Sequence, residues 1–100
     1  DVVILLSHMG MPLDEALAAQ VPGIDVILGG RNAMILPPSR YDTTGPIITQ
    51  AGSRGQIVGF LELRVNSTGE VTGFVGKFHA LGENYPEDPQ VRALLERYPQ

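Results

Sequence analysis

The clearest hydrophobic pattern in the chain is a pair of apolar runs separated by a helical stretch. Residues 1–6 (DVVILL) and residues 24–30 (IDVILGG) are rich in β-branched side chains and show no regular polar alternation. Runs of this kind are typical of strands that are covered on both faces, as in a parallel sheet. Two such strands with a helix between them predict a βαβ unit.

The helix is predicted over residues 12–20. Pro12 suits the first helical position, and Asp14 and Glu15 fall in the first turn, where carboxylates favour the positive end of the helix dipole. The pair Pro22 and Gly23 ends the helix. Its core-facing stripe is expected at positions four residues apart, which are Leu13, Leu17 and Val21.

The next part of the chain predicts a long loop followed by antiparallel strands. Residues 32–45 contain two consecutive prolines and favour an irregular surface loop. Three strands are then expected to pair antiparallel, the last two through a hairpin loop at residues 66–69, where Asn and Gly tolerate positive φ. These strands are predicted over residues 46–51, 56–65 and 71–81.

A second helix is predicted near the end of the chain. Asp88 is placed to cap it, with Pro89 in its first position. Its apolar stripe consists of Val91, Leu94, Leu95 and Tyr98. The predicted fold class is α/β, with a βαβ unit followed by antiparallel strands and a C-terminal helix. We expect the chain to divide into a domain over residues 1–86 and a terminal helix over residues 87–100.

Composition narrows the functional classes. The chain has 100 residues, 43% of them hydrophobic, and a net charge of −4 with its seven basic residues scattered. Scattered cations argue against a nucleic-acid surface and against a polybasic membrane patch. With no cysteine, disulfides and thiolate metal sites are excluded. Because the first residue already lies in an apolar run, we expect the sequence to be a segment of a longer protein.

Candidate chemistry lies where the two apolar runs end. His8 follows the first run, and Gly30, Arg31 and Asn32 follow the second. The carboxyl ends of parallel strands meet at one edge of a sheet, so we expect these residues to lie together. Imidazole binds transition metals and shuttles protons, but a catalytic metal site needs about three protein ligands. Arg31 and Asn32 are candidates for ligand binding, since a guanidinium binds phosphate or carboxylate, although Arg31 could equally be a solvated loop residue.

The other possible ligands do not complete a metal site. Asp25 begins its strand and so lies at the end away from His8. Asp42 belongs to the long loop, and nothing in its spacing directs it to His8. His79 falls in a predicted hairpin strand, where a partly exposed structural residue is expected. From the residues alone, His8 is therefore expected to be a structural or solvent-facing histidine and not part of a complete metal site.

Five segments, in order, resemble the C-terminal half of the catalytic domain of the 5′-nucleotidase-like metallophosphoesterases, in the calcineurin-like phosphoesterase superfamily. They lie at residues 1–10, 21–30, 47–52, 55–63 and 87–91. The resemblance implies a sandwich of sheets flanked by helices, with a pair of divalent metal ions at a sheet edge. It also implies a hydrolase of nucleotide catabolism that cleaves phosphate esters, in which the metals activate a bound water.

The resemblance also predicts which residues should hold metal, and the chain departs from that pattern. In the family the histidine of a Ser-His-x-Gly sequence is a ligand, and His8 matches it. A Gly-His-x-His motif then supplies two further ligands, but those positions are Arg31 and Ala33 here. A guanidinium stays protonated and alanine has no donor atom. The family's remaining ligands belong to the first half of the domain, which precedes the segment resembled here.

We therefore predict that this chain alone carries no cofactor and does not hydrolyse phosphate esters. The alternative function is a non-catalytic binding or interaction domain that keeps the fold without the metal site. In that case Arg31 would be a fixed cation that holds an anion beside His8. A third interpretation is an α/β domain unrelated to the family, which the matching order of segments disfavours.

Partners and location follow from the same resemblance. Half of a sandwich leaves a sheet face and an edge uncovered, and such an edge invites pairing. We expect the remainder of the parent domain as a partner, or a homo-oligomer formed through the exposed face or edge. Residues 87–100 would then link to a further domain. Many relatives are periplasmic or extracellular, whereas the sequence itself indicates no compartment.

Overall fold

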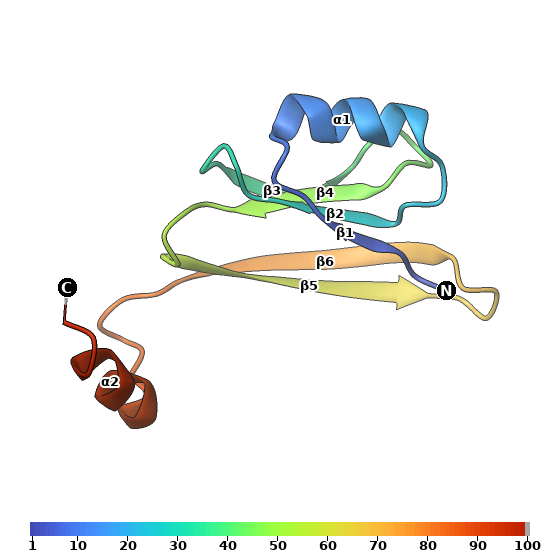
Figure 1. Cartoon of the computed structure of the whole chain (residues 1–100). Helices are drawn as coiled ribbons and strands as arrows, with labels where there is room; N and C mark the ends of the chain where they lie inside the picture. The colour runs from blue at the N-terminus through green and yellow to red at the C-terminus, as the bar shows by residue number, and fades with distance from the viewer. Residues whose placement is uncertain (100) are drawn as a thin grey trace.

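The computed structural model describes residues 1–99 and shows a layered α/β arrangement (Figure 1). A four-stranded sheet has the order β1-β2-β4-β3, with helix α1 over one face and the hairpin β5–β6 along the other. Helix α2 extends away from these layers. The predicted fold class is confirmed. The bounds are β1 Ile4–Leu6, α1 Met11–Gln20, β2 Val26–Gly29, β3 Ile35–Arg40, β4 Ile47–Ala51, β5 Ile57–Val65, β6 Val71–Ala80 and α2 Pro89–Glu96.

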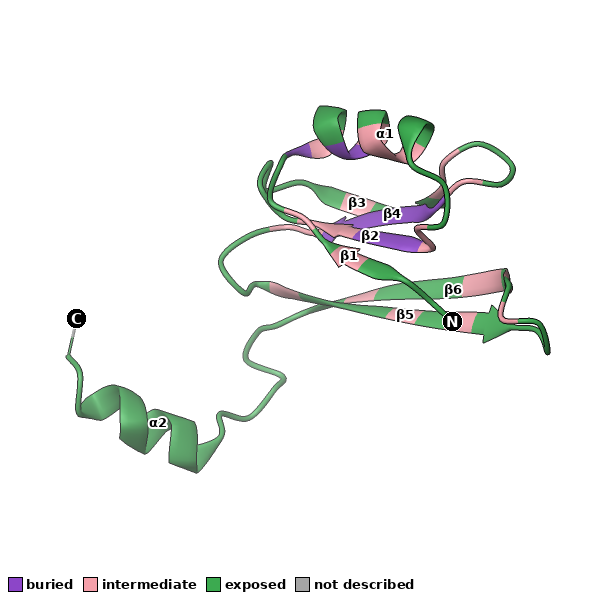
Figure 2. Cartoon of the chain, turned by 45° about the vertical axis from the view of Figure 1, so that its right-hand side comes forward, coloured by how far each residue is buried: buried purple, intermediate pink, exposed green. Residues whose placement is uncertain are grey.

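The core lies in the two central strands of the sheet. β1 runs parallel to β2, and β2 runs parallel to β4, so the predicted βαβ unit is confirmed. Figure 2 shows the buried residues concentrated in β2 and β4, between the helix and the hairpin. The buried apolar side chains are Val26, Ile27, Ile47 and Ile48. These strands are covered on both faces, as the continuous apolar run that includes β2 predicts.

β1 does not have the burial that its sequence predicts. Ile4 is 53% exposed and Leu6 is 76% exposed, although the run was expected to be covered on both faces. The reason is that β1 is an edge strand, with β2 as its neighbour on one side. An apolar run indicates a strand but does not tell how many neighbours the strand has. Pairing of this edge with a further strand stays a prediction.

The stripe predicted for the first helix is wrong at two of its three positions, and Leu17 is the one that packs. Leu13 is 54% exposed and Val21 is 41% exposed, whereas Asp14 is fully buried. The face that packs on the sheet consists of Asp14, Leu17 and Ala18, which are spaced at i, i+3 and i+4. Asp14 is therefore part of the interior and not a solvated partner of the helix dipole.

The predicted loop at residues 32–45 contains a strand instead. β3 pairs antiparallel with β4 from Ile35 to Arg40, and its register shifts between Leu36 and Ser39. The two prolines lie inside this shift, at the edge of the sheet. Proline is tolerated at an edge or a bulge because the missing N–H costs no ladder hydrogen bond there. Arg40 then donates from its guanidinium to the carbonyl groups of Gly45 and Val71, at 3.1 and 3.3 Å.

The predicted pairing of the strand at residues 46–51 is wrong as well. β4 pairs parallel with β2 and antiparallel with β3, and it forms no ladder with the hairpin. A turn through Gly52, whose φ is 78°, carries the chain from the sheet into the second layer. Alternation within a strand specifies its faces but not its partners, which explains the error.

The hairpin is confirmed and closes on a polar loop. β5 and β6 pair antiparallel from Ile57 opposite Ala80 to Val65 opposite Val71. In the loop, Glu70 accepts hydrogen bonds from the Thr68 hydroxyl at 2.8 Å and the Asn66 amide at 3.4 Å. The hydrogen bond from Thr68, and then that from Asn66, lowers the pKa of Glu70 because both favour the charged carboxylate.

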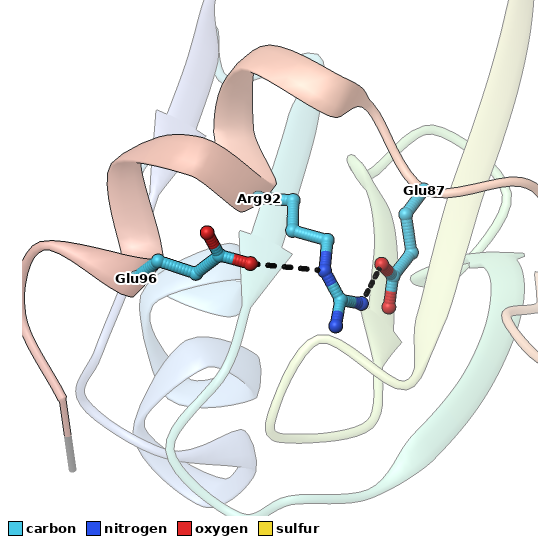
Figure 3. Close-up of polar contacts among 3 residues, drawn as sticks. All are labelled: Glu87, Arg92 and Glu96. Atoms are coloured by element: carbon cyan, nitrogen blue, oxygen red, sulfur yellow. Dashed lines mark hydrogen bonds and ion pairs between the residues drawn. The ribbon is translucent and has the colours of Figure 1, made fainter.

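Helix α2 begins as its sequence predicts. The Asp88 carboxylate accepts from the backbone N–H groups of Gln90 and Val91, at 2.8 and 3.2 Å. Figure 3 shows Arg92 between Glu87 and Glu96, and the Arg92–Glu96 pair spans 3.5 Å at i, i+4. Both ion pairs raise the pKa of Arg92, with the hydrogen bond to Glu87 the main cause. Residue 100 of the predicted terminal segment lies outside the described residues. Neither helix, within residues 1–99, is long and apolar enough to cross a membrane.

Packing between the sheet and the hairpin is incomplete. A cavity of about 360 Å³ separates the two layers. Its lining is mostly apolar and includes Ile4, Leu28, Pro38, Leu61, Leu63 and Phe78. Close packing is therefore concentrated in β2 and β4, beneath α1, where the buried residues lie.

Candidate functional site

Two turns meet where β1 and β2 end. The side chain of Asn32, after β2, accepts a hydrogen bond from the backbone N–H of Met11 at 2.5 Å. Arg31 Cδ lies 3.8 Å from the position that a Cβ of Gly10 would occupy. The turn that carries His8 therefore lies against the turn that carries Arg31 and Asn32. We refer to residues 7–10 and 30–33 together as the strand-end site.

The start of α1 belongs to this site. Gly10 is the residue before the helix, with a φ of 98°, and it has no side chain to cap the first turn. Asn32 supplies the missing acceptor from the neighbouring turn, because the Met11 N–H is one of the groups that a helix leaves unpaired at its start. A Cβ at Gly10 would lie 3.3 Å from Asn32 Oδ1, so glycine allows the close approach. Asn32, predicted as a ligand-binding residue, thus caps a helix.

His8 and Arg31 present their charged or ionisable groups to solvent. Both residues are exposed. Within residues 1–99, neither side chain has a hydrogen-bond or ion-pair partner. The positive end of the α1 dipole adds to the charge of the Arg31 guanidinium at the same place. The strand-end site therefore favours an anion over a cation.

Next to His8 in the chain begins a buried polar cluster, which we define as the half-buried Ser7 together with the buried Asp14 and Gln50. The Ser7 hydroxyl donates to Asp14 Oδ1 at 2.5 Å and accepts from the Met9 N–H at 3.2 Å. Asp14 is 0% exposed and Gln50 is 2% exposed. Sequence reasoning missed this cluster, because Asp14 in a first helical turn was assigned to the dipole. Its helical spacing from Leu17 and Ala18 was the available signal.

The remaining ligand candidates lie elsewhere. Asp25 Oδ2 accepts from the Val3 N–H at 2.8 Å, which places it at the opposite end of the strands from His8. Asp42 lies in the turn before β4 with a φ of 57°, and His79 is an exposed residue paired with Val58 in the hairpin. The structure does not bring any of these three to the strand-end site.

A dinuclear metal centre does not fit the donors of this segment. No group of three or more His, Cys, Asp or Glu side chains that could hold a metal ion occurs within residues 1–99. At the strand-end site His8 supplies the one imidazole, and the side-chain oxygens of Ser7 and Asn32 are already engaged in hydrogen bonds. Arg31 is a permanent cation and Ala33 has no donor. Ala33 also has a φ of 55°, in the left-handed region. The site residues therefore remain candidates for ligand binding.

The sequence is similar to known phosphoesterases along most of its length. Human 5′-nucleotidase is 27% identical over 113 aligned positions, which cover 96% of this chain and 20% of that protein. An uncharacterised metallophosphoesterase of Bacillus subtilis, YunD, is 37% identical over 67 residues, which cover 67% of this chain and 14% of that protein. No family model matches. The chain spans about one fifth of the length of the 5′-nucleotidases that it matches.

Solved structures give the same assignment. A 5′-nucleotidase precursor from Thermus thermophilus superposes with a TM-score of 0.85 at 26% identity, covering 97% of this chain and 22% of that one. The sulfate thiohydrolase SoxB of the same organism, in complex with glycerol, gives 0.86 at 32% identity, covering 96% of this chain and 18% of that one. In sequence and in fold, this chain is therefore 5′-nucleotidase-like and corresponds to one segment of a metallophosphoesterase.

Proposed function

We propose that this chain supplies the phosphate-facing edge of a phosphoesterase-type domain. In the longer protein, that edge would contribute to the hydrolysis of nucleotides or related phosphate esters. The chain by itself would hydrolyse none. The named relatives include 5′-nucleotidases, which supports a nucleotide phosphate as the ligand class.

One observation carries the proposal. Arg31 and His8 lie on adjacent turns that the Asn32–Met11 hydrogen bond joins, and neither side chain is paired within residues 1–99. A planar guanidinium forms two parallel hydrogen bonds to a phosphate, so it selects that geometry over a point anion. His8 would contact the same phosphate from the end of β1. The nearby start of α1 adds a favourable dipole.

Phosphate titration followed by NMR tests the anion site. Inorganic phosphate should shift the signals of Arg31 and His8, and Arg31→Gln should abolish the shift at His8. Arg97→Gln is the matched control, because Arg97 is an exposed arginine at the end of α2. Wild-type protein without a shift at Arg31 or His8 contradicts the proposal, as does an equal loss in the control.

Inactivity of the chain alone follows from its donor chemistry. The strand-end site has a single imidazole, and no cluster of three His, Cys, Asp or Glu side chains occurs among the described residues 1–99, whereas a catalytic metal site needs about three protein ligands. We expect no hydrolysis of p-nitrophenyl phosphate or AMP above the buffer rate, with Mn²⁺ or Zn²⁺ added. Turnover that His8→Ala removes would overturn this expectation.

The second candidate function is a binding domain that keeps the fold without catalysis. The guanidinium of Arg31 favours it, because a fixed cation at the end of β2 binds an anion without metal. Metal analysis of the full-length protein separates the two functions. A pair of transition-metal ions per chain supports the enzyme, whereas phosphate binding that a chelator does not change supports the binding domain.

A further inference from the structure

We propose that Asp14 is a positioning residue for His8 and that it acts through Ser7. The inference rests on the proposed contact of His8 with phosphate, and it adds a residue that lies in the interior. Asp14 touches neither solvent nor the exposed side of the strand-end site. Its effect must therefore pass through the groups that it holds.

The first step is a relay of two hydrogen bonds around His8. The Ser7 hydroxyl donates to Asp14 Oδ1 at 2.5 Å, and the same oxygen accepts from the Met9 N–H at 3.2 Å. A hydroxyl has one proton and two acceptor lone pairs, so it can make both bonds together. The residues before and after His8 are thus fixed to a buried carboxyl group. The hydrogen bond to Asp14 fixes the direction in which the Ser7 hydroxyl donates. Removal of the Asp14 carboxyl group would therefore free that hydroxyl to rotate.

The second step is that Asp14 itself has little freedom to move. The Ser7 backbone N–H donates to the Leu28 carbonyl at 2.9 Å, and the Asp14 N–H donates to the Gly10 carbonyl at 2.9 Å. On its other side, Asp14 Oδ2 and Gln50 Nε2 each lie 2.9 Å from the position of a Cβ on Gly29. The carboxyl group is therefore held between α1, the turn after β1, and strands β2 and β4.

The third step concerns the cost of keeping this cluster polar. Asp14 Oδ2 and both amide atoms of Gln50 are buried and have no hydrogen-bond partner within residues 1–99. Buried polar groups without partners destabilise a fold, and an apolar residue at position 14 would avoid that cost. A buried carboxyl group that has one unpaired oxygen and uses the other to fix the turn around His8 is consistent with a positioning function.

Hydrogen exchange and imidazole NMR on the whole chain test the relay directly. Ser7→Ala should accelerate exchange of the Met9 amide about fivefold to tenfold, as expected for the loss of one hydrogen bond. It should also shift the ring signals of His8, and Ser7→Thr should restore both readouts. Asp14→Asn, which keeps the shape of the side chain, should leave the His8 signals closer to wild type than Asp14→Ala.

The matched control is Thr49→Val. Thr49 donates its hydroxyl to the Leu36 carbonyl at 2.8 Å, so this variant also loses a hydroxyl hydrogen bond to the sheet, but not beside His8. It should leave the Met9 exchange rate and the His8 signals unchanged. If Ser7→Ala has wild-type values for both, or if Thr49→Val changes them equally, the positioning function is refuted. The Ser7 variants decide the matter even if the Asp14 variants fail to fold.

Phosphate titration of the same samples separates this inference from the proposed function. Suppose that wild-type protein binds no phosphate, while Ser7→Ala still accelerates exchange of the Met9 amide and shifts the His8 ring signals. The proposed function then fails and the relay stands. If wild type binds and Ser7→Ala weakens binding about fivefold, the relay also governs the ligand. Unchanged affinity in Ser7→Ala shows that the relay does not position His8 for phosphate and overturns the inference.

Discussion

A methyl group at Gly29 tests the packing around the buried polar cluster. The added Cβ would lie 2.9 Å from Asp14 Oδ2, 2.9 Å from Gln50 Nε2 and 3.0 Å from Gln50 Cγ. Real Cβ contacts are longer than this, and both side chains are fully buried, so neither can swing into solvent. Overpacking of a core costs about 1–3 kcal/mol. Replacement of glycine by alanine within a strand stabilises the folded state by about 0.5–1 kcal/mol, which offsets part of the overpacking cost.

Gly29→Ala should therefore lower the free energy of unfolding by about 1–2 kcal/mol. Urea denaturation measures it, and a slope near 1 kcal/mol/M for so small a domain moves the midpoint down by about 1–2 M. The neighbouring Gly30→Ala is the control, because a Cβ at Gly30 would meet nothing within 4 Å. Equal midpoints for the two variants would refute the packing argument, and so would stabilisation by Gly29→Ala.

Three further predictions concern other parts of the chain. Asp88→Ala removes the cap of α2 and costs about 1 kcal/mol of helix stability, so the Cα shifts of α2 should move towards coil values while those of the sheet stay fixed. Asp88→Ser should retain the helix, and a helical α2 in the alanine variant contradicts the prediction. Thr68→Ala removes the main hydrogen bond that lowers the pKa of Glu70, so a carboxyl titration by NMR should give a pKa nearer the ordinary value. The stabilisation from the Glu70 carboxylate is present above the ordinary glutamate pKa and is lost as the pH falls through the pKa of the folded state. An unchanged Glu70 pKa in Thr68→Ala would exclude the Thr68 hydrogen bond as the cause of the lowered pKa. Gly76→Ala would make a Cβ overlap the Cγ of Pro38 in β3 and lie 2.9 Å from its Cδ, whereas a Cβ at Gly73 would lie no nearer than 3.6 Å to the Arg64 side chain. In urea denaturation, the free energy of unfolding should fall by about 1–3 kcal/mol in Gly76→Ala and by less than about 0.5 kcal/mol in Gly73→Ala. Similar values for the two variants would show that the proline ring shifts to accommodate the methyl group.

The parts of the fold that the sequence predicts correctly depend on local signals. The Asp88–Pro89 start of α2 and the polar loop at residues 66–69 need only neighbours in the chain. The βαβ unit is nearly as local, since a helix between two apolar runs dictates parallel strands. Each of these predictions uses contacts within a short stretch, where capping and turn chemistry decide the structure.

The errors arise where a distant partner decides the structure. β3 forms despite its two prolines because β4 provides a ladder at the edge of the sheet. β4 pairs with β2 and not with the hairpin, and the sequence of β4 alone does not specify this partner. Ile4 and Leu6 are exposed because β1 has a neighbour on one side alone. Edge position and pairing are properties of the whole sheet.

The candidate site also has one part that the sequence predicts and one part that depends on distant partners. The meeting of the two turns follows from parallel strands and was predictable, so the Asn32–Met11 hydrogen bond lies where His8 and Arg31 were expected. The burial of Asp14 was not predictable from the first turn alone. Its hydrogen-bond partner Ser7 follows β1 and the unpaired Gln50 lies near the end of β4, and only the assembled sheet brings them to one helix face.

The contacts that shape the strand-end site do not involve the side chains that would carry its chemistry. Ser7, Asp14 and Asn32 hold the two turns through hydrogen bonds to one another and to the backbone. His8 and Arg31 project from those turns without partners within residues 1–99. A histidine or an arginine can therefore occupy the end of β2 without changing the hydrogen bonds that build the turn. For this reason a close likeness in fold is compatible with a different ligand chemistry, and the function has to be argued from the side chains at the site.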